Sequence, residues 1–301
     1  MYNTPVLFLI FNREDTARKV FEAIRLQKPK YLFVAADGAR KHKEGEAETC
    51  QRVRDLIKVD WDCELKTLFR NENLGCKMAL SSAITWFFEH VEQGIILEDD
   101  CLPDPSFFPY CEELLERYKD DTRIGHISGD NYLPNIIEEG LSYDFCSYAH
   151  IWGWATWRRA WKNYDVNFPF WNEQKDKRSF LYCNKWDEIF FSSFIPNSLS
   201  NRNGISAWDT QWFCTLRVQN QLSIYPTVNM IKNIGFDDPS TATHTTKGKN
   251  PGSSSTSISF PLKHPQYILR NKKLEKETGR KMFFSWKKLG RYILNRIMNN
   301  N

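Results

Sequence analysis

Residues 94–105 read Gly-Ile-Ile-Leu-Glu-Asp-Asp-Cys-Leu-Pro-Asp-Pro, and this stretch says most about the fold. Its short apolar run, residues 95–97, is bounded by glycine and proline and predicts a buried strand. The run ends in three adjacent carboxylates, Glu98, Asp99 and Asp100, which repel one another unless a cation or hydrogen-bond donors hold them. Open α/β sheets bind their ligands at the carboxyl ends of the strands. The stretch therefore predicts a site at that edge of a sheet.

The three carboxylates also indicate the kind of ligand. Hard oxygen donors suit Mg²⁺ or Mn²⁺, which proteins usually hold through one or two carboxylates and the phosphates of a substrate. A metal diphosphate site is the interpretation that follows. The alternative is an acidic loop ahead of a helix, in which Asp104 before Pro105 would act as the cap.

The first 130 residues alternate between strand and helix patterns, which predicts βαβ crossovers and a mostly parallel sheet. With 301 residues and 41% hydrophobic content, the chain can form one large α/β domain or two small ones. Beyond residue 130 the pattern is irregular and aromatic. Strands are expected at 6–11, 31–36, 65–69, 95–97, 124–128 and 222–226, and helices at 15–26, 50–57, 78–88, 107–118 and 209–220.

The net charge of +4 is unevenly distributed. Residues 262–301 hold 11 Lys and Arg and two Glu, a net +9, which leaves −5 for the rest of the chain. This tail also carries aromatic and aliphatic side chains, which predicts peripheral contact with an anionic membrane surface. The alternative is a solvated helix packed on the domain. No nucleic-acid partner is expected.

Cysteine usage and hydropathy bear on the compartment. The eight cysteines are scattered and form no Cys-x-x-Cys pair, which favours free thiols in a reducing compartment. No apolar run approaches the roughly 18–20 residues of a membrane span. The run at residues 5–11 is too short for a signal peptide. We expect a cytoplasmic protein, at the inner face of the membrane if the tail binds there.

Polar side chains follow each of the first four expected strands. Asn12 and Arg13 follow the first, where Arg13 suits a phosphate and Asn12 a base or ribose. Asp37 follows the second and precedes Gly38, and its carboxylate can accept the imide N–H of a uracil-like base. Each also has an ordinary explanation, because Asp-Gly is a common turn and Arg13 can form an exposed ion pair.

The third strand is followed by Asn73, Gly75 and Lys77 at the expected start of a helix. A phosphate there would meet a helix N-terminus and an ammonium group. The ordinary explanation is a plain helix entry. A functional role is favoured because all these groups, together with residues 98–100, lie at the same edge of one expected sheet.

Several blocks of the sequence, in this order, resemble GT-A glycosyltransferases over roughly residues 3–245. The resemblance is greatest to N-acetylglucosaminyltransferase I and its bacterial relatives in surface-polysaccharide clusters. It implies a Rossmann-like GT-A fold. The blocks are Phe-Leu-Ile-Phe-Asn-Arg at 8–13, Ala-Asp-Gly at 36–38, Asn-Leu-Gly at 73–75, Glu-Asp-Asp at 98–100, Gly-Trp-Ala-Thr-Trp at 153–157, Trp-Asp-Thr-Gln-Trp at 208–212 and Asn-Ile-Gly at 233–235.

The resemblance also implies roles for individual residues. Asp37 would recognise the nucleobase, Asp99 would contact the ribose or sugar, and Asp100 would ligate the Mn²⁺ or Mg²⁺ that bridges the diphosphate. The rest of the nucleotide-sugar site would be Phe11, Asn12, Arg13, Asn73, Gly75, Lys77, Glu98 and Trp154.

Asp209 would be the general base that takes the proton of an acceptor hydroxyl. N-acetylglucosaminyltransferase I has two adjacent acids between its tryptophans, whereas here Asp209 is followed by Thr210 and Gln211. The alternative for Asp209 is a helix N-cap.

Two further residues have equally weighted alternatives. His244 would complete the metal coordination, or it is a solvated loop histidine. Trp154, like the tryptophans at 152, 157 and 161, could stack on a sugar ring, or it could pack in the core with Trp157 and Trp161 at helical spacing.

The function expected is a metal-dependent, inverting hexosyl- or N-acetylhexosaminyltransferase. It would move a sugar from a nucleotide-diphosphate donor, UDP-linked, to a glycan or lipid-linked acceptor in surface-polysaccharide synthesis. Residues 1–262 would form the GT-A domain, with a nucleotide-sugar half at 1–130 and an acceptor half at 131–262, and residues 263–301 the tail. The alternatives are a nucleotidyltransferase or metal-dependent phosphohydrolase, and a lectin-like protein. The Gly-free segment 9–13 disfavours a nucleotidyltransferase, and the intact acids disfavour the lectin.

Overall fold

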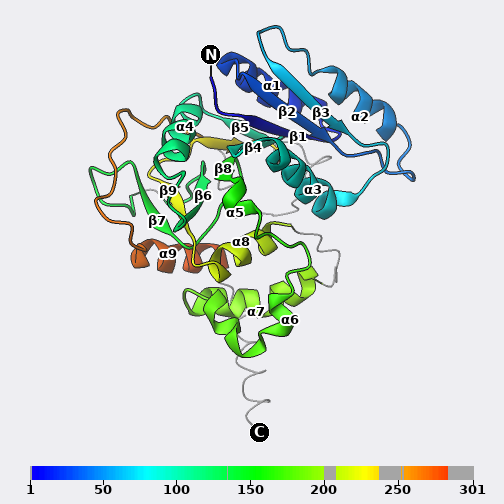
Figure 1. The fold of residues 1–301 in the computed structure, drawn as a ribbon. Coiled ribbons are helices and arrows are strands. Elements are labelled where there is room, and N and C mark those ends of the chain that lie inside the picture. Colours follow the sequence, from blue (N-terminus) through cyan, green and yellow to red (C-terminus); the bar gives the residue numbers. More distant parts are fainter. Residues whose placement is uncertain (1, 134, 200–207, 237–251, 253, 284–301) are drawn as a thin grey trace.

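The computed structural model describes residues 2–133, 135–199, 208–236, 252 and 254–283. Strands and helices alternate through the first part of the chain (Figure 1). The elements there are β1 (Val6–Ile10), α1 (Glu14–Gln27), β2 (Tyr31–Ala36), α2 (Glu46–Asp55), β3 (Glu64–Phe69), α3 (Gly75–His90), β4 (Gln93–Glu98), β5 (Cys101–Pro103), α4 (Phe107–Arg117) and β6 (Ile124–Ser128).

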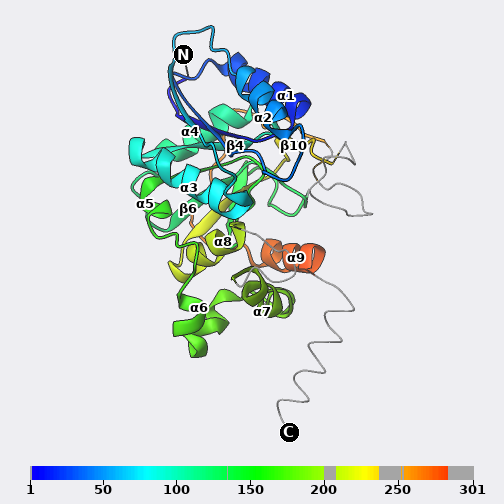
Figure 2. The ribbon, with the colours of Figure 1, turned by 90° about the vertical axis from the view of Figure 1, so that its right-hand side faces the viewer.

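The second part has shorter strands and a group of helices that the sequence patterns did not predict. Figure 2 shows α6 and α7 at the end of the molecule away from α1 and α2. The elements are β7 (Tyr143–Cys146), β8 (Trp154–Trp157), α5 (Arg158–Trp161), α6 (Phe170–Glu173), the 3-10 helix η1 (Lys175–Leu181), α7 (Lys185–Leu199), α8 (Asp209–Val218), β9 (Leu222–Pro226), β10 (Ile231–Asn233) and α9 (Lys272–Phe283).

The central sheet has the strand order β3-β2-β1-β4-β8-β6-β9-β7. Strands β3, β2, β1 and β4 are parallel to their neighbours, and β6 is parallel to β9. Strand β8 is antiparallel to both β4 and β6, and β7 is an antiparallel edge strand. Strands β5 and β10 form a separate antiparallel pair. The predicted α/β, Rossmann-like architecture with a mostly parallel central sheet is confirmed.

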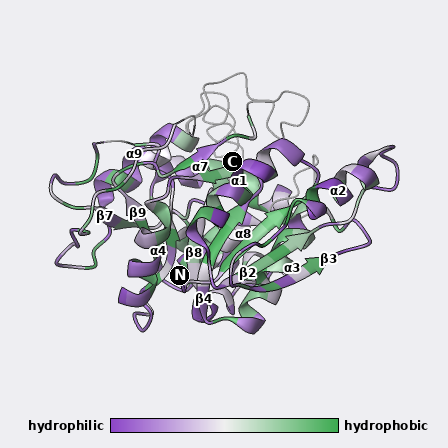
Figure 3. Cartoon of the chain, turned by 90° about the horizontal axis from the view of Figure 1, so that it is seen from above, coloured by the Kyte–Doolittle hydropathy of each residue, from purple (hydrophilic) through white to green (hydrophobic). Residues whose placement is uncertain are grey.

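Strand β1 reads as an unbroken apolar run because both of its faces are covered. Val6, Phe8 and Ile10 belong to the core cluster that α1 and α4 share, whereas Leu7 and Leu9 belong to the cluster of α3 and α8. Seen from above, hydrophobic strands lie in the middle of the molecule with hydrophilic residues around them (Figure 3). Such a strand can present polar groups only beyond its ends, which is where the candidate site residues lie.

Trp154, Trp157 and Trp161 do not lie on one helix, although their spacing in the sequence is helical. Trp154 and Trp157 lie on strand β8, and α5 begins only at Arg158. Because side chains alternate along a strand, the two point to opposite faces. Trp154 packs with α3 and α8, and Trp157 packs on the α4 side, where its Nε1–H donates to the Leu115 carbonyl at 3.1 Å.

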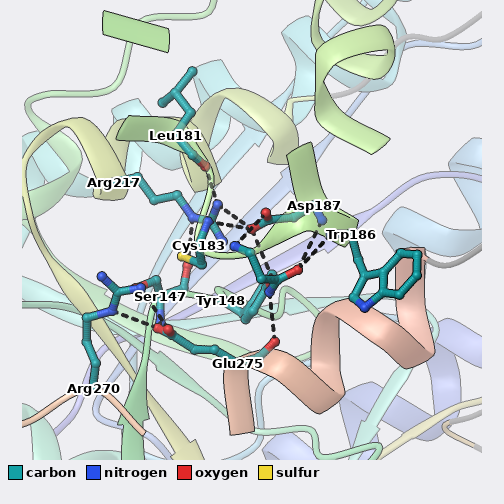
Figure 4. Close-up of polar contacts among 10 residues, drawn as sticks. Ser147, Tyr148, Leu181, Cys183, Trp186, Asp187, Arg217, Arg270 and Glu275 are labelled. Atoms are coloured by element: carbon teal, nitrogen blue, oxygen red, sulfur yellow. Dashed lines mark hydrogen bonds and ion pairs between the residues drawn. The ribbon is translucent and has the colours of Figure 1, made fainter. Parts of the chain in front are cut away.

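Helix α9 packs against α7 and β7. Its buried Glu275 accepts a hydrogen bond from the Ser147 N–H at 2.9 Å and pairs with Arg270 at 2.7 Å (Figure 4). The Asn184 amide donates to the Glu275 carbonyl at 3.1 Å. The described part of the expected tail is therefore held on the body of the protein, as the packed-helix alternative anticipated.

A buried ion pair fixes α8 against the same region. Arg217 of α8 lies 2.9 Å from Asp187 of α7, and its Nε–H donates to the Ser147 carbonyl at 3.2 Å (Figure 4). Tyr148 donates to the same Asp187 carboxylate at 3.1 Å. A buried pair of this kind is costly to break, because it leaves an uncompensated charge. It therefore holds α8, whose first residue is Asp209, in one position.

Candidate active site

The topology brings the polar strand ends to one edge. Because β3, β2, β1 and β4 are adjacent and parallel, their carboxyl ends lie side by side. Phe11 to Arg13 follow β1, Asp37 follows β2, Asn73 follows β3, and Glu98 ends β4. The sequence expectation that these residues meet at one edge of the sheet agrees with this arrangement.

Asp37 organises the start of α3. Its carboxylate accepts hydrogen bonds from the Asn73 amide at 3.0 Å, from the Leu74 N–H at 3.0 Å and from the Gly75 N–H at 3.1 Å. Gly75 has a φ of +76°, a conformation that side chains disfavour. A Cβ on Gly38 would lie 2.4 Å from the Glu72 backbone, so the Asp-Gly turn requires glycine. The β2 end and the α3 N-terminus thus form one rigid unit.

The carboxylates of residues 98–100, called here the acidic triplet, are only partly neutralised. Arg13 Nη1 lies 2.5 Å from the Asp100 carboxylate and 3.5 Å from that of Asp99. The Phe11 N–H also donates to Asp99, at 3.2 Å. Among the described residues, one guanidinium therefore faces three carboxylates, and the surplus negative charge would attract a cation.

The pKa values reflect this surplus. Burial raises the pKa of Glu98 well above its usual range, and the charges of Asp100, Asp99 and Asp209 raise it further. Burial, followed by the charge of Asp100, also raises the pKa of Asp99, against the opposing effect of Arg13. Both groups would ionise more readily with a bound cation nearby.

Asp209 reaches the triplet from the second half of the chain. It is the first residue of α8, its carboxylate accepts the Thr210 N–H at 2.8 Å, and Trp208 occupies the cap position. Its charge is close enough to Glu98 to raise the pKa of that carboxyl. The structure thus brings a fourth carboxylate within electrostatic range of the triplet, 109 positions after Asp100 in the sequence.

Cys76 lies within electrostatic range of these groups and was missed by the sequence reasoning. The residue is exposed, yet burial raises the pKa of its thiol to about 12, with Glu98, Asp209 and Asp37 adding to the effect. The thiol is therefore accessible to a reagent while it lies near three carboxylates of the candidate site. Nothing in its sequence context, between Gly75 and Lys77, distinguishes it from the other cysteines.

Asn12 and Lys77 lie beside the site in different settings. The Asn12 amide donates to Glu46 at 2.9 Å, and Arg40 binds the same carboxylate and lies 5.6 Å from the Phe11 ring centre. Lys77 is only 9% exposed, and burial lowers its pKa. Among the described residues its ammonium has no ion pair. A buried cation of this kind would be stabilised by an anion.

Trp154 presents no surface to a ligand, because it is 0% exposed. Its ring stacks on His126 at 5.0 Å and on Trp208 at 5.8 Å, and it contacts Trp161 and Trp212. The core-packing alternative describes this position. Through Trp208 and Trp212 the cluster positions the start of α8 and therefore Asp209. His244 lies outside the described residues.

The fit of the site to a divalent cation rests on the chemistry of its donors. Among the described residues, no group of three or more His, Cys, Asp or Glu side chains could hold a metal ion by itself. Mg²⁺ and Mn²⁺ do not require one, since substrate phosphates usually supply part of their coordination. A Cβ at Gly235 would lie 2.4 Å from Asp100 Oδ2, so glycine is required where the backbone after β10 packs against this carboxylate and fixes its position. The carboxylate donors present suit such an ion.

No family model matches the chain, and a search of curated proteins finds no match. Solved structures of similar architecture include a mannosyltransferase from Pyrobaculum calidifontis in complex with GDP-Man and Mn²⁺ (15% identity, TM-score 0.37, 55% of this chain and 49% of that one). Mouse xyloside xylosyltransferase 1 (10%, 0.31, 53% and 69%) is another. A cytidylyltransferase from Leptospira borgpetersenii (9%, 0.32, 54% and 63%) also matches.

The chain spans about half the length of the mannosyltransferase that it matches. With TM-scores below 0.5 and identities of 15% or less, these likenesses carry no argument about function. The expected resemblance to N-acetylglucosaminyltransferase I is not shown by them. The case for a function therefore rests on the geometry of the site.

We predict that UDP with Mn²⁺ protects Cys76 from alkylation. At ten times its Kd, the nucleotide should slow the reaction with iodoacetamide about tenfold, because only the free protein reacts. In its absence the rate should rise roughly tenfold per pH unit from pH 7 to 10, since the thiolate is the nucleophile and its pKa is about 12. Peptide mass spectrometry reads the rate at each cysteine.

Cys63 is the internal control, because it lies just before β3 at the opposite edge of the sheet and is partly exposed. Its alkylation rate should not respond to UDP. Equal alkylation of Cys76 with and without saturating UDP would show that the nucleotide does not bind at this edge of the sheet.

Proposed function

We propose that the protein is a metal-dependent, inverting glycosyltransferase. It would transfer a hexosyl or N-acetylhexosaminyl group from a UDP-linked donor to a glycan or lipid-linked acceptor in surface-polysaccharide synthesis. The observation that carries the proposal is the position of Asp209. This carboxylate from the second half of the chain begins α8 within electrostatic range of Glu98 and of Cys76 at the start of α3. The acidic triplet would hold the metal ion and the diphosphate, and Asp209 would accept a proton.

The donor would bind along the edge of the sheet. Asp37 and Asn73 would face the nucleobase, and the spare acceptor capacity of the Asp37 carboxylate is suited to an imide N–H. Asp99 would contact the ribose or the sugar. Phe11 and Asn12 would line the same side, held in place by the Glu46 and Arg40 contacts.

The departing diphosphate gathers negative charge as the glycosidic bond breaks. A divalent ion held by Asp100 would neutralise part of that charge. Arg13 already contacts Asp100 at 2.5 Å and would lie within reach of a phosphate oxygen. Lys77 and the N-terminus of α3 would supply further positive potential.

Asp209 would take the proton from the acceptor hydroxyl as that oxygen attacks the anomeric carbon. The transition state is oxocarbenium-like, and a single displacement from the face opposite the diphosphate inverts the configuration. The aromatic residues around the start of α8 would exclude water from this carboxylate. Glu98, whose raised pKa partly reflects Asp209, would add to the negative potential near the reacting carbon.

We predict that Asp209→Asn lowers turnover by about 10²–10⁴-fold, the usual contribution of a general base, and leaves donor affinity unchanged. The amide keeps the side-chain shape but cannot accept the proton. Transfer from UDP-hexoses and UDP-N-acetylhexosamines to a panel of short glycans, followed by chromatography of the released nucleotide, measures the effect.

Asp62→Asn is the matched control, because Asp62 is an exposed carboxylate beyond the opposite edge of the sheet. It should behave as the wild type. A loss of less than about tenfold in Asp209→Asn would contradict the base assignment. Release of UMP or pyrophosphate in place of UDP would instead indicate the nucleotidyltransferase or phosphohydrolase alternative.

We also propose that α9 and the segment beyond it contact the cytoplasmic face of an anionic membrane. The buried side of α9 packs on the body, and its outer side exposes Lys272, Lys273, Lys276 and Arg280. Within the described residues no helix is long and apolar enough to cross a membrane. Each Lys or Arg near an anionic leaflet contributes about 1 kcal/mol. Such contact would place the site near a lipid-linked acceptor.

We predict that the triple variant Lys272→Glu, Lys273→Glu, Lys276→Glu loses co-sedimentation with phosphatidylglycerol vesicles. The same change at the exposed lysines Lys41, Lys43 and Lys58 on the other side of the fold should have little effect. Wild type should not sediment with neutral phosphatidylcholine vesicles. Equal binding to both kinds of vesicle, or full binding by the α9 variant, would exclude this electrostatic contact.

A further inference from the structure

Three aromatic side chains form a wall next to the candidate metal ligand. Trp152 contacts Tyr132 with ring centres 5.3 Å apart at 70°, and it contacts Phe236 at 5.7 Å and 62°. All three side chains are partly exposed. They come from three separate segments that follow β6, precede β8 and follow β10. This aromatic wall is therefore a product of the fold and not of one local motif.

The wall adjoins Asp100 through the segment after β10. The Ile234 N–H donates to the Asp100 carbonyl at 2.8 Å, Gly235 packs on the Asp100 carboxylate, and Phe236 follows directly. Trp152 also packs close to Gly252, where an added Cβ would lie 2.8 Å from the indole. Phe236 of the wall therefore directly follows Gly235, which packs on Asp100, the proposed metal ligand.

A buried polar pair fixes the orientation of Tyr132. Its ring stacks on His150 at 5.0 Å and 25°, and its N–H donates to the Tyr225 hydroxyl at 3.2 Å. Behind it, His150 Nδ1 lies 3.3 Å from the carboxylate of Asp130, which is 0% exposed. The stacking on His150 and the hydrogen bond to Tyr225 together hold the Tyr132 ring in front of this buried pair.

We propose that the aromatic wall of Tyr132, Trp152 and Phe236 is the binding platform for the acceptor sugar. This inference rests on the proposed function, because it identifies where the second substrate binds. Sugar rings have an apolar C–H face, which matches the negative face of an aromatic ring, and a rim of hydroxyls, which matches adjacent carboxylates. A hydroxyl of a ring stacked on Trp152 would lie on the Asp100 side of the wall, toward the donor. Asp130 and His150 act as positioning residues through Tyr132.

The test is saturation-transfer NMR with methyl glycosides of glucose, galactose, mannose and N-acetylglucosamine, in the presence of UDP and Mn²⁺. At least one glycoside should receive saturation, most strongly at the C–H protons of one ring face. Trp152→Ala should weaken that signal about tenfold, as expected for the loss of one stacking contact. Trp152→Phe should retain part of it, and should serve as the readout if the alanine variant fails to fold.

Trp86→Ala is the matched control, because Trp86 is a partly exposed tryptophan near the far end of α3. It should leave the glycoside signal unchanged. Calorimetry of UDP with Mn²⁺ should give the same Kd in all folded variants. For the positioning pair, His150→Gln should weaken the glycoside signal while UDP affinity is retained.

Three outcomes would overturn the proposal: no glycoside signal in the wild type, an unchanged signal in both Trp152 variants, or a loss of UDP affinity in Trp152→Ala. The last would make the wall part of the donor site. A wild type that fails to bind UDP with Mn²⁺ contradicts the proposed function itself. The two failures are therefore distinguishable.

Discussion

The arrangement of the site depends on a charge imbalance at the end of β4. Within the part of the chain that the structure describes, three carboxylates lie there and one guanidinium, that of Arg13, pairs with them, and burial raises the pKa values of Glu98 and Asp99. Such a cluster is unfavourable in a folded protein unless a cation compensates it. Gly235 packs against the Asp100 carboxylate and holds it in place, because any side chain at position 235 would collide with it. The contacts around residues 98–100 therefore hold in place a group of carboxylates that would otherwise repel one another.

The second half of the chain places the remaining groups around that point. The core cluster of Trp154, Trp161, Trp208 and Trp212 packs α8 against the sheet, and the buried Arg217–Asp187 pair fixes it from the other side. This packing fixes the position of Asp209, the first residue of α8, relative to Glu98. Helix α9 is attached to the same region by Glu275, which accepts a hydrogen bond from the Ser147 N–H. The tryptophans of this core thus position α8, whereas Trp152, which is partly exposed, contacts Phe236 near Asp100.

Much of the first half of the fold could be predicted, because a strand covered on both faces must be apolar throughout and must end where polar groups begin. This holds for β1, β2 and the end of β4. The relation of Asp209 to the triplet could not be derived from periodicity, since long-range packing sets it. Strand β8 has only four residues, too few to show its period, so Trp154 looked helical. Helix α7 was missed for two reasons. Its apolar residues are spread around the helix and form no single face, and Pro196 lies inside it.

The most direct test of the account is calorimetry of UDP binding with and without Mn²⁺, in the wild type and in Asp100→Asn. The account predicts that UDP binds the wild type tightly only when Mn²⁺ is present. In Asp100→Asn, which keeps the side-chain volume but removes the anionic ligand, the Mn²⁺ dependence should disappear while circular dichroism and the melting temperature show a folded protein. Equal UDP affinity with and without Mn²⁺ in the wild type, or an unchanged Mn²⁺ dependence in folded Asp100→Asn, would contradict the central claim.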